Sequence, residues 1–400
     1  MSQAKKLFWI LFLLNLLNYF DRQVLYSVFP LLQTDLHLTD LQLGTLASAF
    51  MAVYMCYAPL VGFFADRTPR HKWIGLSALI WSGATLFCAG AKNFSSLLVA
   101  RGLIGAGEAG FTTIAQPFLA EHFPAQKRAS LLAKFGLALP LGAALGYAIG
   151  GFIGEHVGWR ETFLIAGIPG IIIGLLAWTS LQDKARLVSS APAPTLRDYL
   201  QLFKNKPFLC VCLTQAMVSF IMGGLSAWTP MYLHRYLQLT PAQAGTYFGI
   251  LVIVGGALGT YLGGRLADQL LRRTVNAYYW LMGGSLLLIM PLLLLATSTF
   301  YLPATLGYFG VGIVCIFLPT GAIAASLVAT TAPEIRSMAF AINIFLIHLL
   351  GDTLSPTFIG WAADKWTLKC AVMLCALVAL PGIFFAWKAA GKQFLLPRRF

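Results

Sequence analysis

The first notable feature of the sequence is how few charged residues it contains. Only 10% of its 400 residues are Asp, Glu, Lys or Arg, against about 25% in ordinary soluble domains. Apolar residues make up 58% of the chain, above the usual share of about 45–50%. Because so few charges can neither coat a globule of this size nor keep a disordered chain solvated, we exclude both classes. A helical protein that crosses a membrane several times is the class that remains.

Sequence signatures of enzymes and metal sites are also missing. The chain has no H-x-x-x-H pair, G-x-S-x-G elbow or phosphate-binding P-loop, and its six histidines are scattered. None of the seven cysteines has zinc-type spacing, and all lie in or at the ends of apolar segments, as buried free thiols do. Alternating segments of about ten residues, typical of outer-membrane strands, are absent. We therefore expect no enzyme, no metal and no cofactor.

Apolar runs between charged, Pro-rich or Gly-rich breaks predict an all-α integral membrane protein with 12 transmembrane helices. The run at the N-terminus has no A-x-A-like cleavage site, so we interpret it as a retained helix and not as a signal peptide. The expected spans are 7–32, 41–65, 73–92, 95–121, 129–154, 160–181, 207–234, 241–267, 275–297, 300–331, 337–363 and 369–390.

The basic residues predict how these spans are oriented. If the N-terminus is cytoplasmic, 19 of the 28 Lys and Arg residues fall in cytoplasmic breaks or at the two ends, and 5 fall on the opposite side. This bias follows the positive-inside rule, so we expect both termini in the cytoplasm. Because the bases are dispersed through loops and form no patch the size of a nucleic-acid groove, we expect no nucleic-acid partner.

The two halves of the chain resemble each other at an offset of about 200 residues. The one long polar connection, 182–206, divides the chain into an N-terminal six-helix bundle, 1–181, and a C-terminal six-helix bundle, 207–400. A weaker repeat has a period of three helices, because spans 2, 5, 8 and 11 each end in Gly-x-x-x-acid. Such nested repeats are typical of secondary transporters.

The loop after span 2, Gly62-Phe-Phe-Ala-Asp66-Arg67-Thr-Pro-Arg70, has a second copy at Gly264-Arg-Leu-Ala-Asp268-Gln-Leu-Leu-Arg272. It resembles the signature loop of the major facilitator superfamily, which implies two pseudo-symmetric six-helix bundles and alternating access. In that family the loop is a cytoplasmic clasp in which the acid caps a neighbouring helix. The resemblance therefore implies conformational-switch roles for six residues: Gly62, Asp66, Arg67, Arg70, Asp268 and Arg272.

Polar and charged residues inside three spans are the candidate functional residues, because an ionisable group in the bilayer costs several kcal/mol. Span 1 has Asn18, Asp21 and Arg22, span 4 has Arg101, Glu108 and Thr112, and span 11 has Asn343, His348, Asp352 and Ser355. In the second half, Ile221 and Ile313 align with Asp21 and Glu108. A charge needed for the structure of both halves would have been repeated, so these charges do not serve such a symmetric role.

This restriction to one half indicates a task done once per transport cycle. We expect Asp21 and Glu108 to carry protons, because desolvation and a neighbouring arginine act in opposite directions on a buried carboxyl. Arg22 or Arg101 would then exchange between these carboxylates and an anionic substrate group. Local charge compensation for Asp21, a snorkelling Arg101 and backbone capping by Asp352 are the structural alternatives.

Three stretches narrow the resemblance: NYFDRQVLYSVFP, RGLIGAGEAGFTTIAQPFLAEHFP and NIFLIHLLGDTLSP. They resemble the Spinster family of lipid carriers, and the short tails resemble its bacterial members. The resemblance implies an inner-membrane transporter of lysophospholipids or sphingoid phosphates, coupled to protons in some members. It makes Asp21, Arg22, Arg101 and Glu108 the coupling and headgroup residues, and Asp352 and Ser355 match its Gly-Asp-x-x-Ser-Pro pattern. Asn18 and Thr112 share helix faces with these charges. We therefore expect Asp21 and Glu108 to couple transport to protons, and six residues to bind substrate: Arg22, Arg101, Asn18, Thr112, Asp352 and Ser355.

Other functions remain open at this point. The Asn-Tyr-x-Asp-Arg stretch of span 1 also resembles proton-coupled organic anion symporters, and a loose Gly-Pro pattern in span 5 resembles multidrug exporters. A membrane enzyme lacks a motif, and a channel fits the repeats less well. The expected partners are the lipid bilayer, protons and an amphipathic or anionic small molecule, with the chain itself a monomer.

Overall fold

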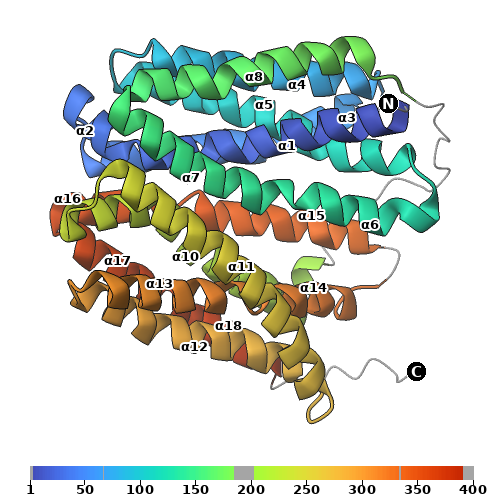
Figure 1. Cartoon of the computed structure of the whole chain (residues 1–400). Helices are drawn as coiled ribbons and strands as arrows, with labels where there is room; N and C mark the ends of the chain where they lie inside the picture. Colours follow the sequence, from blue (N-terminus) through green and yellow to red (C-terminus); the bar gives the residue numbers. More distant parts are fainter. Residues whose placement is uncertain (1–2, 66, 184–201, 333–334, 391–400) are drawn as a thin grey trace. The chain divides into compact units, whose positions relative to one another are not determined.

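The computed structural model describes residues 3–65, 67–183, 202–332 and 335–390, and in these ranges all regular structure is helical (Figure 1). The helices of the first half are α1 (Gln3–Ser27), α2 (Phe29–Leu36), α3 (Asp40–Ala65), α4 (Arg70–Ala89), α5 (Phe94–Glu121), α6 (Ala125–Gly136), α7 (Ala138–His156) and α8 (Trp159–Ser180). The second half has α10 (Lys206–Leu237), α11 (Pro241–Leu271), α12 (Ala277–Ser298), α13 (Leu302–Phe317), α14 (Thr320–Ala329), α15 (Arg336–Ile347), the π-helix η2 (His348–Asp352), α16 (Ser355–Lys365), α17 (Leu368–Leu377) and α18 (Ala379–Ala390).

Eleven helices, counting those that continue across a break, are long and apolar enough to cross a membrane in the described part of the chain. The prediction of an all-α, multi-pass membrane fold is confirmed. The helix missing from the eleven is α1, whose 25 residues include Asn15, Asn18, Asp21 and Arg22. These side chains lower its hydropathy, and α1 is still long enough to cross about 30 Å of hydrocarbon.

Five expected spans are divided into shorter helices. The divisions fall at Val28, Leu137, Leu318–Pro319, Thr353–Leu354 and Val378. Each division lies within three residues of a following proline or at the proline itself: Pro30, Pro140, Pro319, Pro356 and Pro381. Proline lacks an N–H and its ring clashes with the carbonyl four residues earlier, so the preceding turn loses its regular hydrogen bonds. The spans are thus where they were expected, but the helices are less continuous.

The chain forms two compact units. The first consists of residues 1–188, 226–253 and 356–364, and the second of 189–225, 254–355 and 365–400. The expected linker, 182–206, lies largely outside the described residues, so the division into bundles 1–181 and 207–400 stays a prediction.

Close helix packing in the first unit depends on glycine. Three glycines spaced four apart, Gly142, Gly146 and Gly150, face α1 from α7. A Cβ atom at Gly146 would lie 2.5 Å from the carbonyl oxygen of Phe20. Small residues let membrane helices approach closely in this way, where no hydrophobic driving force acts between them. In Figure 1, α1 and α7 accordingly run side by side.

On the other side of the unit, α4 packs against both α5 and α8, and α3 packs against α5. In the second unit, α12 packs against α13, α14, α17 and α18. Its buried core includes Phe208, Met282, Leu327 and Met338.

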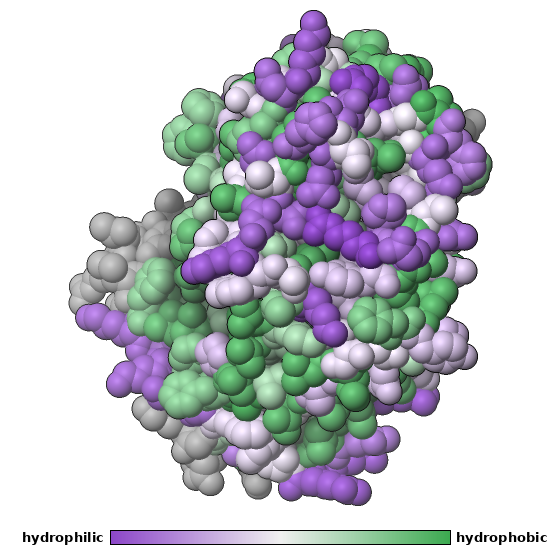
Figure 2. Space-filling view, turned by 90° about the vertical axis from the view of Figure 1, so that its left-hand side faces the viewer, coloured by the Kyte–Doolittle hydropathy of each residue, from purple (hydrophilic) through white to green (hydrophobic). Residues whose placement is uncertain are grey.

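One end of the first unit bears the connection between α2 and α3, residues 37–39, and we refer to it as the Asp40 end. Figure 2 looks onto this end, and hydrophilic residues gather in a band across the upper half of the view. Exposed polar residues at this end include Asp35 in the last turn of α2, and His37, Lys92 and Asn93 in the connections. A polar end beside apolar helix flanks is the surface expected where helices leave the bilayer.

Candidate functional site

Five of the candidate polar and charged residues of the first unit lie on two neighbouring helices. Asn18, Asp21 and Arg22 are on α1, and Arg101 and Glu108 are on α5; we call these five residues the buried charge cluster. Asn18, Arg101 and Glu108 are completely buried, and Asp21 is 3% exposed. Helix α5 packs closely against α3 at Gly105, which has no side chain. A Cβ atom at this position would lie 2.3 Å from the carbonyl oxygen of Phe50 on α3.

Arg22 and Glu108 form an ion pair inside this cluster. Nε of Arg22 donates to Oε2 of Glu108 over 2.6 Å, and the two side chains are 15% and 0% exposed. The residues are 86 positions apart in sequence, so the pair holds α1 to α5. A buried pair of this kind is costly to break, because the remaining charge has no water to solvate it.

Aromatic rings surround the Arg22 guanidinium. Its Cζ atom lies 5.1 Å from the ring centre of Tyr19, 5.1 Å from that of Phe50 and 5.0 Å from that of Tyr54. The negative face of an aromatic ring attracts a cation at this distance, by about 0.5–2 kcal/mol per contact. Arg22 therefore keeps favourable surroundings even when its bond to Glu108 is broken.

Arg101 is buried without a hydrogen-bond acceptor. Its side chain is completely buried, and none of its three side-chain nitrogen atoms has a hydrogen-bond partner among the described residues. Its Cζ atom lies 4.8 Å from the ring centre of Phe50, and its charge acts electrostatically on Asp21 and Glu108. The alternative that Arg101 snorkels to the membrane surface does not fit this burial.

The remaining polar atoms of the cluster have spare hydrogen-bonding capacity. Oδ2 of Asp21 accepts from the hydroxyl of Thr85 over 3.2 Å. Within the described ranges, the other Asp21 oxygen, Oε1 of Glu108 and both side-chain polar atoms of Asn18 have no partner. Buried polar atoms are usually paired, so a group of unpaired ones is a feature of a site that binds something.

Thr112 lies on α5 one turn beyond Glu108. Its hydroxyl is 2.6 Å from the hydroxyl of Tyr54 and also donates to the carbonyl oxygen of Glu108. Tyr54 thus contacts Arg22 of the cluster through its ring, and Thr112 beside the cluster through its hydroxyl.

Asp352 and Ser355 belong to the second unit or its boundary, at the break in the eleventh span. Gly351 has a non-helical backbone conformation there, and Asp352 accepts from Nδ1 of His348 over 2.9 Å. Ser355 is completely buried, and its hydroxyl has no partner in the part of the chain that the structure describes. The alternative for Asp352 was that it caps free backbone groups. The structure shows that its carboxylate also has a side-chain partner, His348.

The expected clasp is described in part. Asp66 lies outside the described residues; Asp268 is exposed on α11, and Arg272 is exposed in the turn that follows α11. Arg67 donates to the carbonyl oxygen of Phe63 over 2.7 Å, and Arg70 donates to Glu121 over 2.6 Å. Gly62 faces Thr113 on α5 at ordinary contact distance, 3.6 Å from a Cβ atom built there. The roles of these residues as a conformational switch stay a prediction.

The acid observed to cap a helix here is one that sequence reasoning missed. Asp183, at the start of the polar connection, accepts from the backbone N–H groups of Arg70 and His71, each over 3.0 Å, at the start of α4. A carboxylate at a helix N-terminus is favourable because it meets unpaired N–H groups and the positive end of the helix dipole. Little in the sequence indicates this role, because Asp183 lies just after the expected span 160–181, at the start of the polar linker.

The arrangement of the cluster suits ion exchange and not bond chemistry. It brings two cations and two carboxylates together in a water-poor interior, with one ion pair made and several polar atoms free. Such a cluster can accept a proton on a carboxyl group or an anion on a guanidinium group.

The chain is similar to known membrane transporters. The family model described as Major Facilitator Superfamily matches residues 11–351. The sphingosine-1-phosphate transporter SPNS2 of Mus musculus is 31% identical over 417 residues, which cover 94% of this chain and 75% of that protein. Protein spinster homolog 1 of Homo sapiens is 30% identical over 416 residues, covering 94% and 79% of the two chains.

A solved structure has the same fold. The crystal structure of a bacterial homolog to the human lysosomal transporter Spinster, in an inward-facing and unoccupied conformation, matches with a TM-score of 0.87. The two are 22% identical, and the match covers 98% of each chain. The D-xylose-proton symporter matches less closely, with a TM-score of 0.71 and 17% identity over 98% of this chain and 100% of that one.

The predictions of a major facilitator fold and of a transporter that is not an enzyme are thus confirmed. The chain is a multi-pass membrane protein that belongs to the major facilitator superfamily and, within it, to the Spinster family.

Proposed function

We propose that the chain moves an amphipathic lipid with an anionic headgroup, such as a lysophospholipid or a sphingoid phosphate, by alternating access and with proton coupling. The observation that carries this proposal is Arg101, a completely buried cation whose nitrogen atoms have no hydrogen-bond acceptor among the residues described. A guanidinium group left in this state costs several kcal/mol of desolvation. An anionic headgroup supplies the missing acceptors, and phosphate fits the planar guanidinium fork with two parallel bonds.

The carboxylates of the cluster suit proton coupling. Oε2 of Glu108 accepts from Arg22, while Oε1 has no described partner and can take a proton. Protonation removes the negative charge that attracts Arg22, and the aromatic rings around its guanidinium still accommodate the cation. Arg22 is then available to the substrate anion, so that binding of a proton and of an anion favour each other. Asp21, with one free oxygen, is the second proton carrier.

The relatives support the substrate class. One is named a sphingosine-1-phosphate transporter in Mus musculus, and another, from Arabidopsis thaliana, is named a probable sphingolipid transporter and is 27% identical over 433 residues. A lysophospholipid and a sphingoid phosphate share one alkyl chain and a phosphate, which is the chemistry that a buried guanidinium in an apolar bundle would select.

The distribution of basic residues supports the proposed orientation. We propose a monomer in the bacterial inner membrane with both termini and the linker 182–206 in the cytoplasm, since most basic residues fall on that side. The Asp40 end then faces away from the cytoplasm.

Thermal stabilisation of the purified protein tests the substrate class. The ligands are a lysophospholipid, a sphingoid phosphate, a set of short organic acids and a set of uncharged and cationic drugs, each measured at two pH values. Stabilisation by the two lipids, stronger at the lower pH, is the expected result. Stabilisation by small acids alone would instead identify an organic anion symporter, and stabilisation by uncharged or cationic drugs alone a multidrug exporter.

Glu108→Gln tests the coupling separately. In proteoliposomes this variant should lose uptake driven by a pH gradient and keep exchange of substrate across the membrane, because it cannot release a proton but still fills the site. Uphill, proton-driven transport by the variant would show that Glu108 does not carry the coupled proton.

A further inference from the structure

Three large aromatic side chains are exposed where two connections of the second unit meet. Phe300 and Tyr301, between α12 and α13, are 64% and 69% exposed, and Trp366, between α16 and α17, is 51% exposed. The two connections lie side by side, because Nζ of Lys369, in the first turn of α17, is 5.2 Å from the ring centre of Phe300. Exposed apolar side chains that gather in one place are a feature of binding surfaces.

Two lysines lie against these rings. One is Lys369, beside Phe300, and the other is Lys365, the last residue of α16, whose Nζ lies 5.2 Å from the ring centre of Trp366. The face of an aromatic ring attracts a cation at this distance. Each ring therefore keeps an ammonium group close to the apolar surface. We refer to Phe300, Tyr301, Trp366, Lys365 and Lys369 as the aromatic–lysine patch.

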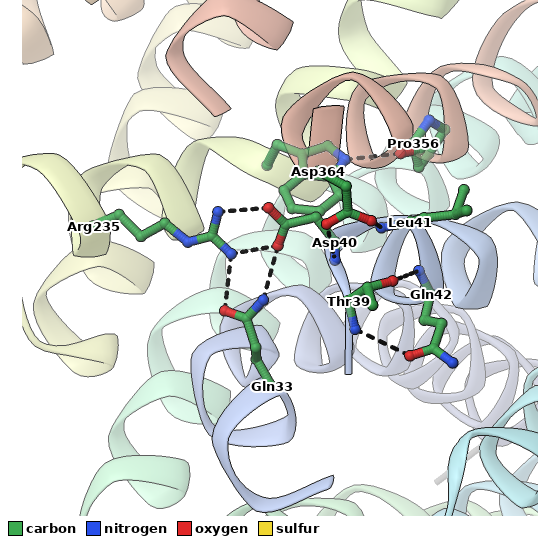
Figure 3. Close-up of polar contacts among 9 residues, drawn as sticks. Gln33, Thr39, Asp40, Leu41, Gln42, Arg235, Pro356 and Asp364 are labelled. Carbon is green, nitrogen blue, oxygen red and sulfur yellow. Dashed lines mark hydrogen bonds and ion pairs between the residues drawn. The ribbon is translucent and has the colours of Figure 1, made fainter. Parts of the chain in front are cut away.

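The segments that form the aromatic–lysine patch contain bases but no acids. Neither residues 295–305 nor residues 365–375 include Asp or Glu. Lys369 also lies in the first turn of α17, where the positive end of the helix dipole makes a base unfavourable. The acid that precedes the patch in sequence, Asp364, accepts from two backbone N–H groups at the start of α3, in the first unit (Figure 3). The patch therefore presents an excess of positive charge, which suits an anionic partner.

The two lysines lie on the side of the membrane where bases are rare. Only 5 of the 28 Lys and Arg residues are expected on this side: Lys92, Arg160, Arg235, Lys365 and Lys369. Arg160 and Arg235 form ion pairs with acids of the first unit, Asp35 and Asp40. The positive-inside rule disfavours bases here, yet two of them lie close together beside exposed rings. Their presence indicates that this side of the membrane offers a negative charge to the patch.

We propose that the aromatic–lysine patch binds the phosphate group of an anionic phospholipid, such as phosphatidylglycerol, in the leaflet on this side of the membrane. Trp and Tyr rings favour the depth of the lipid headgroups, and lysine side chains reach the phosphates from there. A headgroup with a net negative charge complements the two ammonium groups, and the lipid chains cover rings that are more than half exposed. This lipid is a bound component of the membrane, so the inference is independent of which substrate is carried.

Photocrosslinking from within the patch tests this site. Tyr301 is replaced by p-benzoylphenylalanine in the full chain, which is embedded in nanodiscs that contain equal amounts of phosphatidylglycerol and phosphatidylcholine with the same acyl chains. Mass spectrometry then gives the ratio of the two lipids crosslinked to the protein. Each lysine should favour phosphatidylglycerol about fivefold, so the ratio should be about 25. Lys365→Gln and Lys369→Gln should each lower the ratio about fivefold, and the double variant should return it to that of the membrane.

Lys92→Gln is the matched control, because Lys92 is an exposed base of the first unit that is expected on the same side of the membrane. Its removal should leave the lipid ratio unchanged. Both leaflets of the nanodisc contain the same lipids, so the result does not depend on how the chain is oriented. A probe at Phe300 covers the case in which the Tyr301 variant does not fold. A ratio equal to that of the membrane with both lysines present would overturn the proposal. Failure of the probe to crosslink any lipid would overturn it as well, since the patch would then face water or a soluble acidic partner.

Discussion

The Arg22–Glu108 pair allows the sharpest quantitative prediction. The variants are Arg22→Gln, Glu108→Gln and the double variant, in a double-mutant cycle. The N–O distance is 2.6 Å and the side chains are 15% and 0% exposed, so the pair is almost unscreened. Breaking a buried pair by removing one partner costs about 3–5 kcal/mol. The rings of Tyr19, Phe50 and Tyr54 still attract Arg22 in Glu108→Gln, which reduces the cost of that variant to about 2–4 kcal/mol.

In the double variant no charge is left without its partner, so most of the cost of the single variants should not add. We expect a coupling free energy of about 2–3 kcal/mol, measured by reversible unfolding in mixed detergent micelles. The pair of Asp35 and Arg160 is the reference, because its side chains are 45% and 41% exposed. Its coupling free energy should be clearly smaller than that of the Arg22–Glu108 pair, because water screens an exposed pair. Equal coupling in the two pairs would refute the reasoning that burial makes the Arg22–Glu108 pair strong.

Two further predictions concern packing and pH. Gly146→Leu should destabilise the protein by more than about 1–3 kcal/mol, because a Cβ atom there would lie 2.5 Å from a carbonyl oxygen of α1; Gly83→Ala, which has nothing within 4 Å, should instead leave thermal stability unchanged or raise it. Hydrogen bonds from Arg160, and then from Trp159, lower the pKa of Asp35. This stabilisation is present above the unfolded-state pKa of about 3.9 and is lost as the pH falls through the lower, folded-state pKa. The melting temperature of Arg160→Gln should therefore be below that of the wild type at neutral pH, and the difference should shrink as the pH falls below the unfolded-state pKa and through the folded-state pKa of Asp35. A difference that stays constant with pH would show that Arg160 acts by packing alone.

Much of the fold could be predicted from the sequence, because a membrane span is a local property of about 20 residues. The expected span 95–121 differs from α5, Phe94–Glu121, by one residue. The breaks within spans were less visible. A proline in a helical pattern can end the helix or remain inside it, as Pro169 does in α8, and only the packing around each one decides.

The candidate site could be predicted residue by residue but not as a set of contacts. Low charge content made Arg101 and Glu108 stand out on one helix. In the structure Glu108 pairs with Arg22, 86 positions away, and Arg101 has no acceptor among the described residues. Nothing in the sequence indicates either contact pattern. Such partners depend on how α1 and α5 are rotated about their axes, which is set by the contacts of Gly105 and its neighbours.

The contacts at the Asp40 end show the same limit. The repeated Gly-x-x-x-acid pattern could be recognised, but its partners could not, since the bond from the backbone N–H of Asp40 to the side chain of Asp364 spans 324 positions. Arg235 counted in the sequence only as one of the few bases on the less basic side of the membrane. In the structure it donates to Asp40 on α3 and to Gln33 on α2, both in the other half of the sequence.

Headgroup discrimination tests the central claim most directly. We would measure the dissociation constants of a lysophospholipid with a phosphate headgroup and of the uncharged monoacylglycerol with the same alkyl chain, for the wild type and for Arg101→Gln. Hydrogen bonds to a charged group contribute about 1.5–3 kcal/mol each. The wild type should therefore prefer the phosphate by at least about tenfold, and Arg101→Gln should lose most of this preference while still binding the uncharged lipid. An unchanged preference in Arg101→Gln would contradict the assignment of Arg101 to an anionic headgroup.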